Sequence, residues 1–186
     1  DVESADVRTL ARTHRTSIED AARRARYAFL ERAASRAGAD RVAVGHTRND
    51  QAETVLLRLV RGAGPRGLAG IYPRAGLIIR PLLDVDRQQL RDYLGRLGTA
   101  FREDDTNRDV RIPRNRVRHE LMPYLQRHFA PGIVDVLGRE AAIAREDAEW
   151  LDARASDAAR DVMRVRGESI EINAAGLAAL PLALGR

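Results

Sequence analysis

One run of ten residues carries the densest set of side chains that could do chemistry. Residues 45–54 have the sequence GHTRNDQAET and contain His46 and Asp50, between an expected strand and the start of an expected helix. Histidine exchanges a proton near neutral pH, a carboxylate can accept a proton or help to hold a cation, and free helix amides can receive an anion. Doubly wound sheets bind ligands at such strand ends. A structural interpretation is also open, in which Asp50 and Glu53 form a capping box and His46 is a satisfied histidine.

Arginines concentrate in a second segment. Between residues 108 and 118, five arginines stand against a single acid, Asp109, which gives a local net charge of +4. On a helix, Arg114 and Arg118 lie four residues apart on one face, while Val117 belongs to the apolar side. Two guanidinium groups so placed suit a phosphate. The alternative interpretation is a solvated basic face.

A third segment, residues 58–80, combines arginines with glycines and contains no acid. Glycine lets a backbone approach a nucleic acid closely, and neutralisation of phosphates supplies much of such binding. An exposed loop is the alternative. The arginines of this segment are Arg58, Arg61, Arg66, Arg74 and Arg80.

Two arginines of the first expected helix, Arg23 and Arg26, are three residues apart. Arg26 can turn toward the strand ends, although solvation at the surface explains either residue as well.

The composition excludes several classes of protein. No stretch approaches the roughly 18 consecutive apolar residues that a membrane helix needs, and the chain does not start with the basic-then-apolar order of a secretory signal, so we expect a cytoplasmic protein. The sequence contains no cysteine, which excludes disulfides, thiolate metal sites and cysteine nucleophiles within these residues. The net charge is +5 and all 32 basic residues are arginine. Arginine suits phosphate, but a GC-rich genome explains the bias more simply.

Helix and strand signals alternate over the first part of the chain. Ser17 and the acids that follow it start a helix, which Gly38 ends. A short strand at residues 41–44 and a second helix capped by Asp50 come next, and a glycine-rich loop follows at residues 62–70. This order of helix, strand and helix predicts an α/β layer.

The next segment predicts another strand and two more helices. Residues 77–80 form the expected strand, and residues 99–102 form a short extended piece. A basic helix begins near Pro113. Between them, Asp86 caps a helix with a predicted buried stripe, made of Leu90, Tyr93, Leu94 and Leu97.

A change of pattern beyond Pro131 indicates a domain boundary. From Ile133 to Val162, apolar residues recur at spacings of three and four, which is typical of one long helix. Residues 169–172 then suggest a short strand, and Asn173 can cap a final helix. We therefore predict one domain over residues 1–128 and a mostly helical one over residues 129–186.

In this order, the blocks resemble the tRNA(Ile)-lysidine synthetase family, within the larger group of PP-loop ATP pyrophosphatases. The resemblance covers about residues 14–125, and its most specific parts are residues 45–54 and residues 114–123, RNRVRHELMP. The other matching blocks are residues 21–30 (AARRARYAFL), 61–70 (RGAGPRGLAG), 80–83 (RPLL) and 105–107 (DTN). The implied fold is a Rossmann-like PP-loop ATPase domain followed by a helical, tRNA-binding C-terminal domain.

The resemblance implies a ligase that works in two steps. ATP adenylates C2 of the wobble cytidine of tRNA(Ile) with a CAU anticodon and releases pyrophosphate, and free L-lysine then displaces AMP. ATP and Mg²⁺ are the implied cofactors, and a homodimeric assembly is allowed. By resemblance, Asp50 and His46 lie at the reacting centre, where Asp50 binds and deprotonates the amine. Phosphate binding and charge stabilisation then fall to Arg26 and Arg118, tRNA binding falls to Arg61, Arg66, Arg114 and Arg116, and no residue is assigned to a metal.

The sequence departs from that family in one important respect. Members carry a Ser-Gly-Gly-x-Asp-Ser loop that wraps the ATP phosphates and places an aspartate on magnesium, and no such run occurs in these 186 residues. We therefore expect an incomplete ATPase domain without its leading strands, inactive as this chain alone. Thr47 and Asn49 also stand where histidine and aspartate are common, which leaves a second metal ligand unsupported. The alternatives are a tRNA thiolase of the same group and a non-catalytic RNA-binding fragment.

Overall fold

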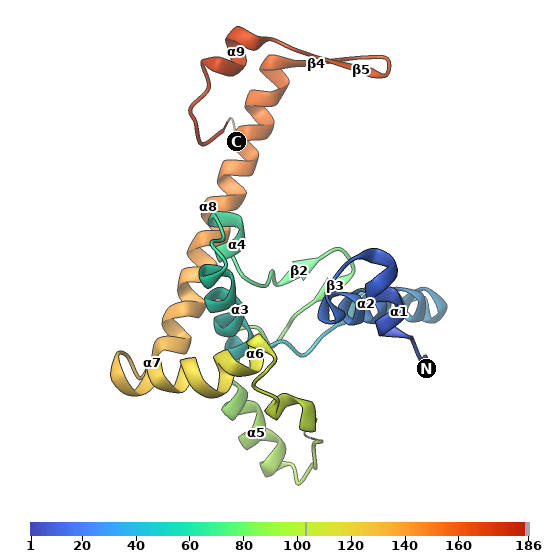
Figure 1. Ribbon diagram of the computed structural model, residues 1–186, viewed down its shortest axis with the longest axis vertical. Coiled ribbons are helices and arrows are strands. Elements are labelled where there is room, and N and C mark those ends of the chain that lie inside the picture. Colours follow the sequence, from blue (N-terminus) through green and yellow to red (C-terminus); the bar gives the residue numbers. More distant parts are fainter. Residues whose placement is uncertain (103, 185–186) are drawn as a thin grey trace. The chain divides into compact units, whose positions relative to one another are not determined.

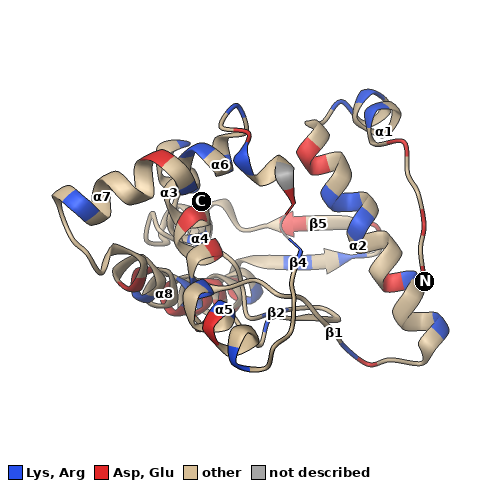
Figure 2. Cartoon of the chain, turned by 90° about the horizontal axis from the view of Figure 1, so that it is seen from below, with Lys and Arg blue, Asp and Glu red and all other residues tan. Residues whose placement is uncertain are grey.

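Helices make up most of the structure (Figure 1), a computed structural model that describes residues 1–102 and 104–184. They belong to two compact units. The first contains residues 1–46 and 73–83, and the second contains residues 47–72 together with the chain from residue 84 onward. Arginines occur on most of the helices and are interspersed with acids, so charge alone does not single out one element (Figure 2).

The first unit combines two helices with a small sheet. Strand β3 lies in the middle of the sheet, parallel to β1 and antiparallel to β2. As predicted, the hydroxyl of Ser17 caps the longer helix by accepting the N–H of Asp20, and Gly38 ends it at φ +63°. The parallel pair is compatible with the predicted α/β class. The elements are α1 (Val7–His14), α2 (Ile18–Ala37), β1 (Val42–Ala43), β2 (Arg74–Ala75) and β3 (Ile78–Ile79).

The second unit is built around one long helix, α8. Its helices are α3 (Arg48–Val60), α4 (Pro65–Leu68), α5 (Arg87–Arg96), η1 (Asp105–Arg108), α6 (Pro113–Arg116), η2 (Val117–Leu121), α7 (Met122–His128), α8 (Ile133–Val162) and α9 (Ala174–Ala178). The strands β4 (Met163–Arg166) and β5 (Ser169–Ile172) form an antiparallel hairpin after α8. Helices α6, η2 and α7 follow one another without a break, and η2 is a π-helical turn. The long helix, the strand at residues 169–172 and the helix after Asn173 are thus as predicted.

The core of the second unit lies between α3 and α8, which run alongside each other in Figure 1. Ala52 on α3 and Ala141 on α8 are both 0 % exposed, so the two backbones approach closely at small side chains. Leu56 and Leu137 extend this contact, and Val117 of η2 closes it from the side. The apolar stripes of three separate helices therefore meet in one core, which also confirms the predicted apolar side of the basic helix.

The start of α3 differs from the prediction. Thr47, not Asp50, is the cap, since its hydroxyl accepts the N–H of Asp50 and the Asp50 carboxylate accepts the N–H of Thr47. Thr47 and Asp50 have the same capping-box spacing as Asp50 and Glu53, and the helix begins at the earlier pair. Glu53 consequently has no capping role and points into the protein, where it is 2 % exposed.

Three further expectations are corrected. The loop at residues 62–70 contains the short helix α4, and the guanidinium of Arg58 holds it by donating to the carbonyls of Gly67 and Gly70 at 2.8 and 2.7 Å. No residue of α5 is buried, and its predicted buried stripe includes Tyr93 at 52 % exposure. Residues 99–102 form no strand. An apolar stripe shows which face a helix turns inward, but not how much of the protein covers that face.

Helix α8 shares its core with α3, and the predicted boundary at residues 128 and 129 stays a prediction. Among the described residues, no helix has the length and apolar character needed to cross a membrane.

The close approach of α3 and α8 predicts the effect of enlarging one alanine. Ala141→Leu should lower the free energy of unfolding by about 1–3 kcal/mol, because the added methylenes have no space. Ala153→Leu is the matched control, since Ala153 is exposed on the same helix. Urea denaturation of both variants tests this, and equal stabilities would show that α3 and α8 are not tightly packed.

Candidate active site: two carboxylates and three arginines

The first two turns of α3 present two carboxylates to the interior of the second unit. The capping box with Thr47 fixes the direction of Asp50, whose Oδ2 accepts from the Thr47 N–H at 2.8 Å and from its hydroxyl at 2.7 Å. Glu53 follows one turn later and is the largest fully buried side chain among the described residues. A buried charge of this kind requires partners of opposite sign.

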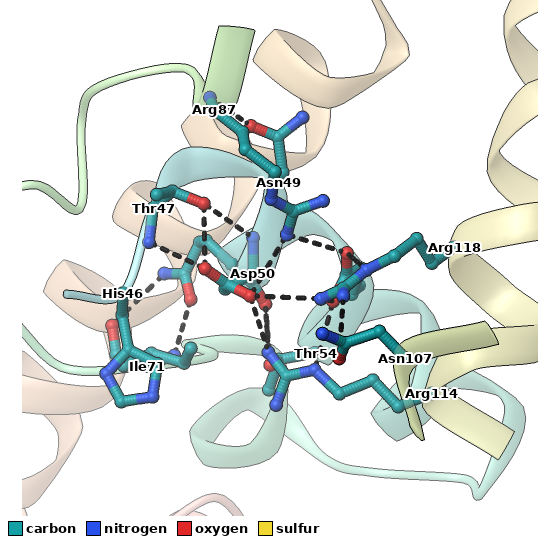
Figure 3. A network of polar contacts seen from close by, with 12 residues as sticks. His46, Thr47, Asn49, Asp50, Thr54, Ile71, Arg87, Asn107, Arg114 and Arg118 are labelled. Atoms are coloured by element: carbon teal, nitrogen blue, oxygen red, sulfur yellow. Dashed lines mark hydrogen bonds and ion pairs between the residues drawn. The ribbon is translucent and has the colours of Figure 1, made fainter. Parts of the chain in front are cut away.

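Three arginines supply those partners (Figure 3). Arg118 binds Glu53 with two parallel hydrogen bonds, from Nε to Oε1 at 2.7 Å and from Nη2 to Oε2 at 2.9 Å. Arg114 Nε donates to Oε2 at 3.0 Å, and Arg87 Nη2 donates to Oε1 at 3.1 Å. Asp50 Oδ1 lies 3.2, 3.3 and 3.4 Å from Nη2 of Arg87, Arg114 and Arg118. The cluster joins α3, α5, α6 and η2.

The cluster has one positive charge in excess, since three guanidinium groups face two carboxylates. Its arginines still reach solvent, with side-chain exposures of 28 % for Arg87, 25 % for Arg114 and 20 % for Arg118. Arg87 uses only Nη2 in these contacts, and a guanidinium carries five N–H donors. The arrangement can therefore bind an anion such as a phosphate through arginines that are already held in place.

Burial and hydrogen bonding act in opposite directions on Asp50. Burial raises the pKa of its carboxyl group, but the N–H and hydroxyl of Thr47, together with Arg87 and Arg114, lower it by more. The net result is a pKa below the ordinary value. A carboxylate with a lowered pKa is a weak base near neutral pH.

Two asparagines support the arginines. Asn49 Oδ1 accepts the backbone N–H of Arg87 at 2.7 Å and so fixes the start of α5. Asn107 Oδ1 lies 3.5 Å from Nη1 of Arg118. An amide at position 49 thus has a structural role beside the cluster.

His46 belongs to the first unit, where Arg80 positions it. Arg80 is 6 % exposed, and its Nε donates to Nδ1 of His46 at 3.2 Å while its Nη2 donates to the hydroxyl of Tyr27 at 3.2 Å. Because Nδ1 accepts a hydrogen bond, the ring proton of the neutral imidazole is on Nε2. His46 is therefore set to donate a hydrogen bond through Nε2.

The other predicted residues of the second unit are not part of the cluster, and Arg26 belongs to the first unit. In the second unit, Arg61 is exposed at the end of α3, and Arg66 forms an ion pair with Asp152 of α8. Arg116 is 63 % exposed and faces Glu120 at 3.9 Å. In the first unit, Arg26 is exposed and borders a cavity of about 680 Å³ lined by α1 and α2. Of the residues predicted for the site, the second unit brings together Asp50, Arg114 and Arg118.

Comparison with known proteins identifies the family. Residues 1–125 match the PP-loop domain. The chain belongs to the PP-loop domain family. A protein named tRNA(Ile)-lysidine synthase from Thermobifida fusca is 48 % identical over 166 residues, which are 89 % of this chain and 50 % of that protein.

Two more relatives with the same name agree with this match. The protein from Geobacter sulfurreducens is 47 % identical over 156 residues, or 83 % of this chain and 33 % of its own length. The protein from Salinispora arenicola is 46 % identical over 172 residues, or 90 % and 51 %. The family recognised in the sequence is thus confirmed, and the chain spans about half or less of the length of these relatives.

In this PP-loop chain, the two carboxylates do not fit a magnesium site. Every oxygen of Asp50 and Glu53 is within hydrogen-bonding distance of a guanidinium or of Thr47, which leaves no free ligand atom for a cation. Among the residues that the structure describes, no group of three or more histidines and acids is arranged to hold a metal.

The roles of three residues of the PP-loop chain are not predicted from the sequence. Glu53 is interpreted there as part of a cap, although it stands in the most specific matching block. Arg80 is interpreted as one of the arginines of residues 58–80 that could neutralise phosphates, whereas in the structure it donates to His46. Arg87 carries no local signal, since nothing in its neighbours indicates that it reaches back to α3.

The buried carboxylate predicts a large effect of removing one charge. Glu53→Gln should lower the free energy of unfolding by about 3 kcal/mol, because it leaves three arginines around a single remaining carboxylate. Glu120→Gln removes an exposed acid of 58 % side-chain exposure and should change stability by less than about 0.5 kcal/mol. Urea denaturation at low and high salt measures both. A Glu53→Gln variant as stable as the Glu120→Gln variant would contradict the cluster.

The lowered pKa of Asp50 predicts how stability depends on pH. A carboxylate whose folded pKa lies below its ordinary value of 3.8 stabilises the fold above that value, and this contribution is lost as the pH falls through the folded pKa. The difference in unfolding free energy between the native chain and Asp50→Asn should therefore be constant near neutral pH and shrink below about pH 4. Chemical denaturation from about pH 7 to about pH 3 follows it. A difference that does not change with pH would mean that Asp50 makes no stabilising contact as an anion.

Proposed function

We propose that this chain is part of a tRNA(Ile)-lysidine synthase, which uses ATP to join L-lysine to C2 of the wobble cytidine of tRNA(Ile). The arginine–carboxylate cluster supports this most directly, because it lies inside the matched PP-loop segment and has the charge and donors that a phosphate needs. The three relatives described above, each named for that activity, agree with it.

The reaction needs an environment that binds and neutralises phosphate. In the first step, an oxygen of the cytidine attacks the α-phosphorus of ATP and pyrophosphate leaves. In the second step, the lysine amine attacks C2 and AMP leaves. Charge develops on phosphate oxygens in both steps, and pre-positioned guanidinium groups stabilise such charge without having to reorganise. Arg87, Arg114 and Arg118 would fill this role.

We assign Asp50 and Glu53 to positioning these arginines. The resemblance suggested that Asp50 deprotonates the lysine amine, but a carboxylate with a lowered pKa that is engaged by Thr47 and three arginines is poorly suited to accept a proton. The excess positive charge of the cluster also favours an anion over the lysine ammonium.

His46 and the exposed arginines complete the proposal. The Nε2–H of His46 would donate to a phosphate oxygen, with the ring held by Arg80. Arg26 would contact a phosphate of ATP. Arg61, Arg66 and Arg116 are exposed and would contact the transfer RNA backbone, so their effect should depend on salt. Magnesium would reach the reaction with ATP, through ligands other than Asp50 and Glu53.

A chimeric enzyme tests the proposal. This chain should replace the matching segment of the Thermobifida fusca protein, and lysidine in a tRNA(Ile) transcript can be measured by mass spectrometry of the digested nucleosides. We expect the chimera to form lysidine and Arg118→Lys to slow it by about 100-fold, because lysine cannot bind Glu53 with two parallel hydrogen bonds. The control Arg127→Lys changes an exposed arginine of α7 that has no assigned role, and it should retain nearly full activity.

Two results would contradict the proposal. One is a folded chimera that binds transfer RNA and ATP yet forms no lysidine. The other is full activity of Arg118→Lys, which would remove the cluster from the reaction.

A further inference from the structure

A second cavity, of about 340 Å³, lies beside the arginine cluster in the second unit. Its walls come from α5, from residues 101, 102 and 104, and from η1 and η2. Arg87 and Arg118 line it as well as belonging to the cluster, so the two sites share two side chains. A ligand in this cavity would therefore lie next to whatever the cluster binds.

The charge of the lining favours an anion. Among the lining residues that the structure describes, Asp104 is the single acid, against five arginines. Arg102 and Arg108 are exposed, and their side chains form no hydrogen bond or ion pair to any described residue. These two guanidinium groups are therefore free to bind an anionic ligand. The five arginines are Arg87, Arg91, Arg102, Arg108 and Arg118.

The rest of the lining consists of two leucines, one aromatic ring, Asn107 and His119. Leu90 and Leu94 line the cavity from α5, and Phe101 lines it as well, with 49 % exposure. The guanidinium carbon of Arg91 is 5.6 Å from the centre of the Phe101 ring. An exposed ring next to cations is the usual platform for an unpaired nucleobase, because the base stacks on the ring while its phosphates meet the charges. Of the apolar stripe of α5, Leu90 and Leu94 line this cavity, whereas Tyr93 and Leu97 do not.

We propose that this cavity binds one unpaired nucleotide of the RNA substrate, with its base stacked on Phe101 and its neighbouring phosphates on Arg102 and Arg108. The volume suits one nucleotide, at the lower end of the range of about 300–1,000 Å³ for small-ligand pockets. An acidic peptide would satisfy the arginines but not the ring. The proposal rests on the proposed function in one respect, namely that the substrate is an RNA.

Base stacking gives a direct test with the 186-residue chain. The probe is a short single-stranded oligoribonucleotide that contains one 2-aminopurine, whose emission changes when the base stacks. Phe101→Leu should weaken binding by about tenfold and remove the emission change, since stacking of one base contributes most of this effect. Phe101→Tyr keeps the ring and should restore both. Phe129→Leu is the matched control, because Phe129, directly after α7, is 72 % exposed and does not line the cavity.

The contribution of Arg102 and Arg108 can be measured separately, from the way RNA affinity depends on salt concentration. The double change Arg102→Gln with Arg108→Gln should reduce the slope of log affinity against log salt by about 1.4, that is by about 0.7 for each phosphate contact to a single strand. The emission change at saturation should remain, since the ring is intact. The control Arg127→Gln removes one exposed arginine outside the cavity.

Two outcomes would overturn the proposal. If Phe101→Leu binds and changes emission like the native chain, no base stacks there. If polyglutamate displaces the oligonucleotide as effectively as unlabelled RNA does, the surface recognises charge alone. Neither outcome depends on lysidine formation. If the chimera forms no lysidine but Phe101 still controls the emission of the probe, the proposed function is rejected and the nucleotide site is retained.

Discussion

The arrangement of the second unit depends on the burial of one carboxylate, that of Glu53. A buried anion is tolerated only with partners that replace its lost hydration, and here those partners come from three separate elements. Arg87 begins α5, Arg114 lies in α6, and Arg118 lies in the π-helical turn that follows. One charge therefore brings together segments that are 34 to 65 residues away along the chain.

A buried ionic cluster is in itself weak evidence for stability. Burying ions is costly, and well-packed apolar residues of the same volume are often as stable or more so. The presence of five charged groups at one place is therefore consistent with the proposed binding role, in which the carboxylates hold the arginines and the arginines bind a ligand. The first unit repeats this logic on a smaller scale, where Arg80 holds a single histidine in one tautomer.

Local chemistry explains which parts of the fold could be predicted from sequence. Ser17 and Gly38 mark the ends of α2, because a capping side chain and a left-handed residue each end a helix through contacts within one turn. The apolar spacing of three and four residues in α8 can be recognised because it repeats over eight turns. The predicted start of α3 is wrong because two pairs of residues, Thr47 with Asp50 and Asp50 with Glu53, both have the spacing of a capping box. Only the packing of the folded chain decides that the helix begins at the first pair. The role of Arg87 lies beyond any local rule. It follows from the ion pairs with α3, which form only in the folded chain.

The π-helical turn η2 has a consequence for the way this segment tolerates change in length. A π-helical turn accommodates one residue more than an α-helical turn, so Arg114 before it and the apolar residues after it do not share a single helical phase. Arg114 and Arg118 face Glu53, while Met122 is buried in the core with α8. Each residue of an α-helix turns the chain by about 100°, so loss of a single residue here would redirect either the cation pair or the core side chain. Insertions and deletions in this segment are therefore more damaging than substitutions that keep its length.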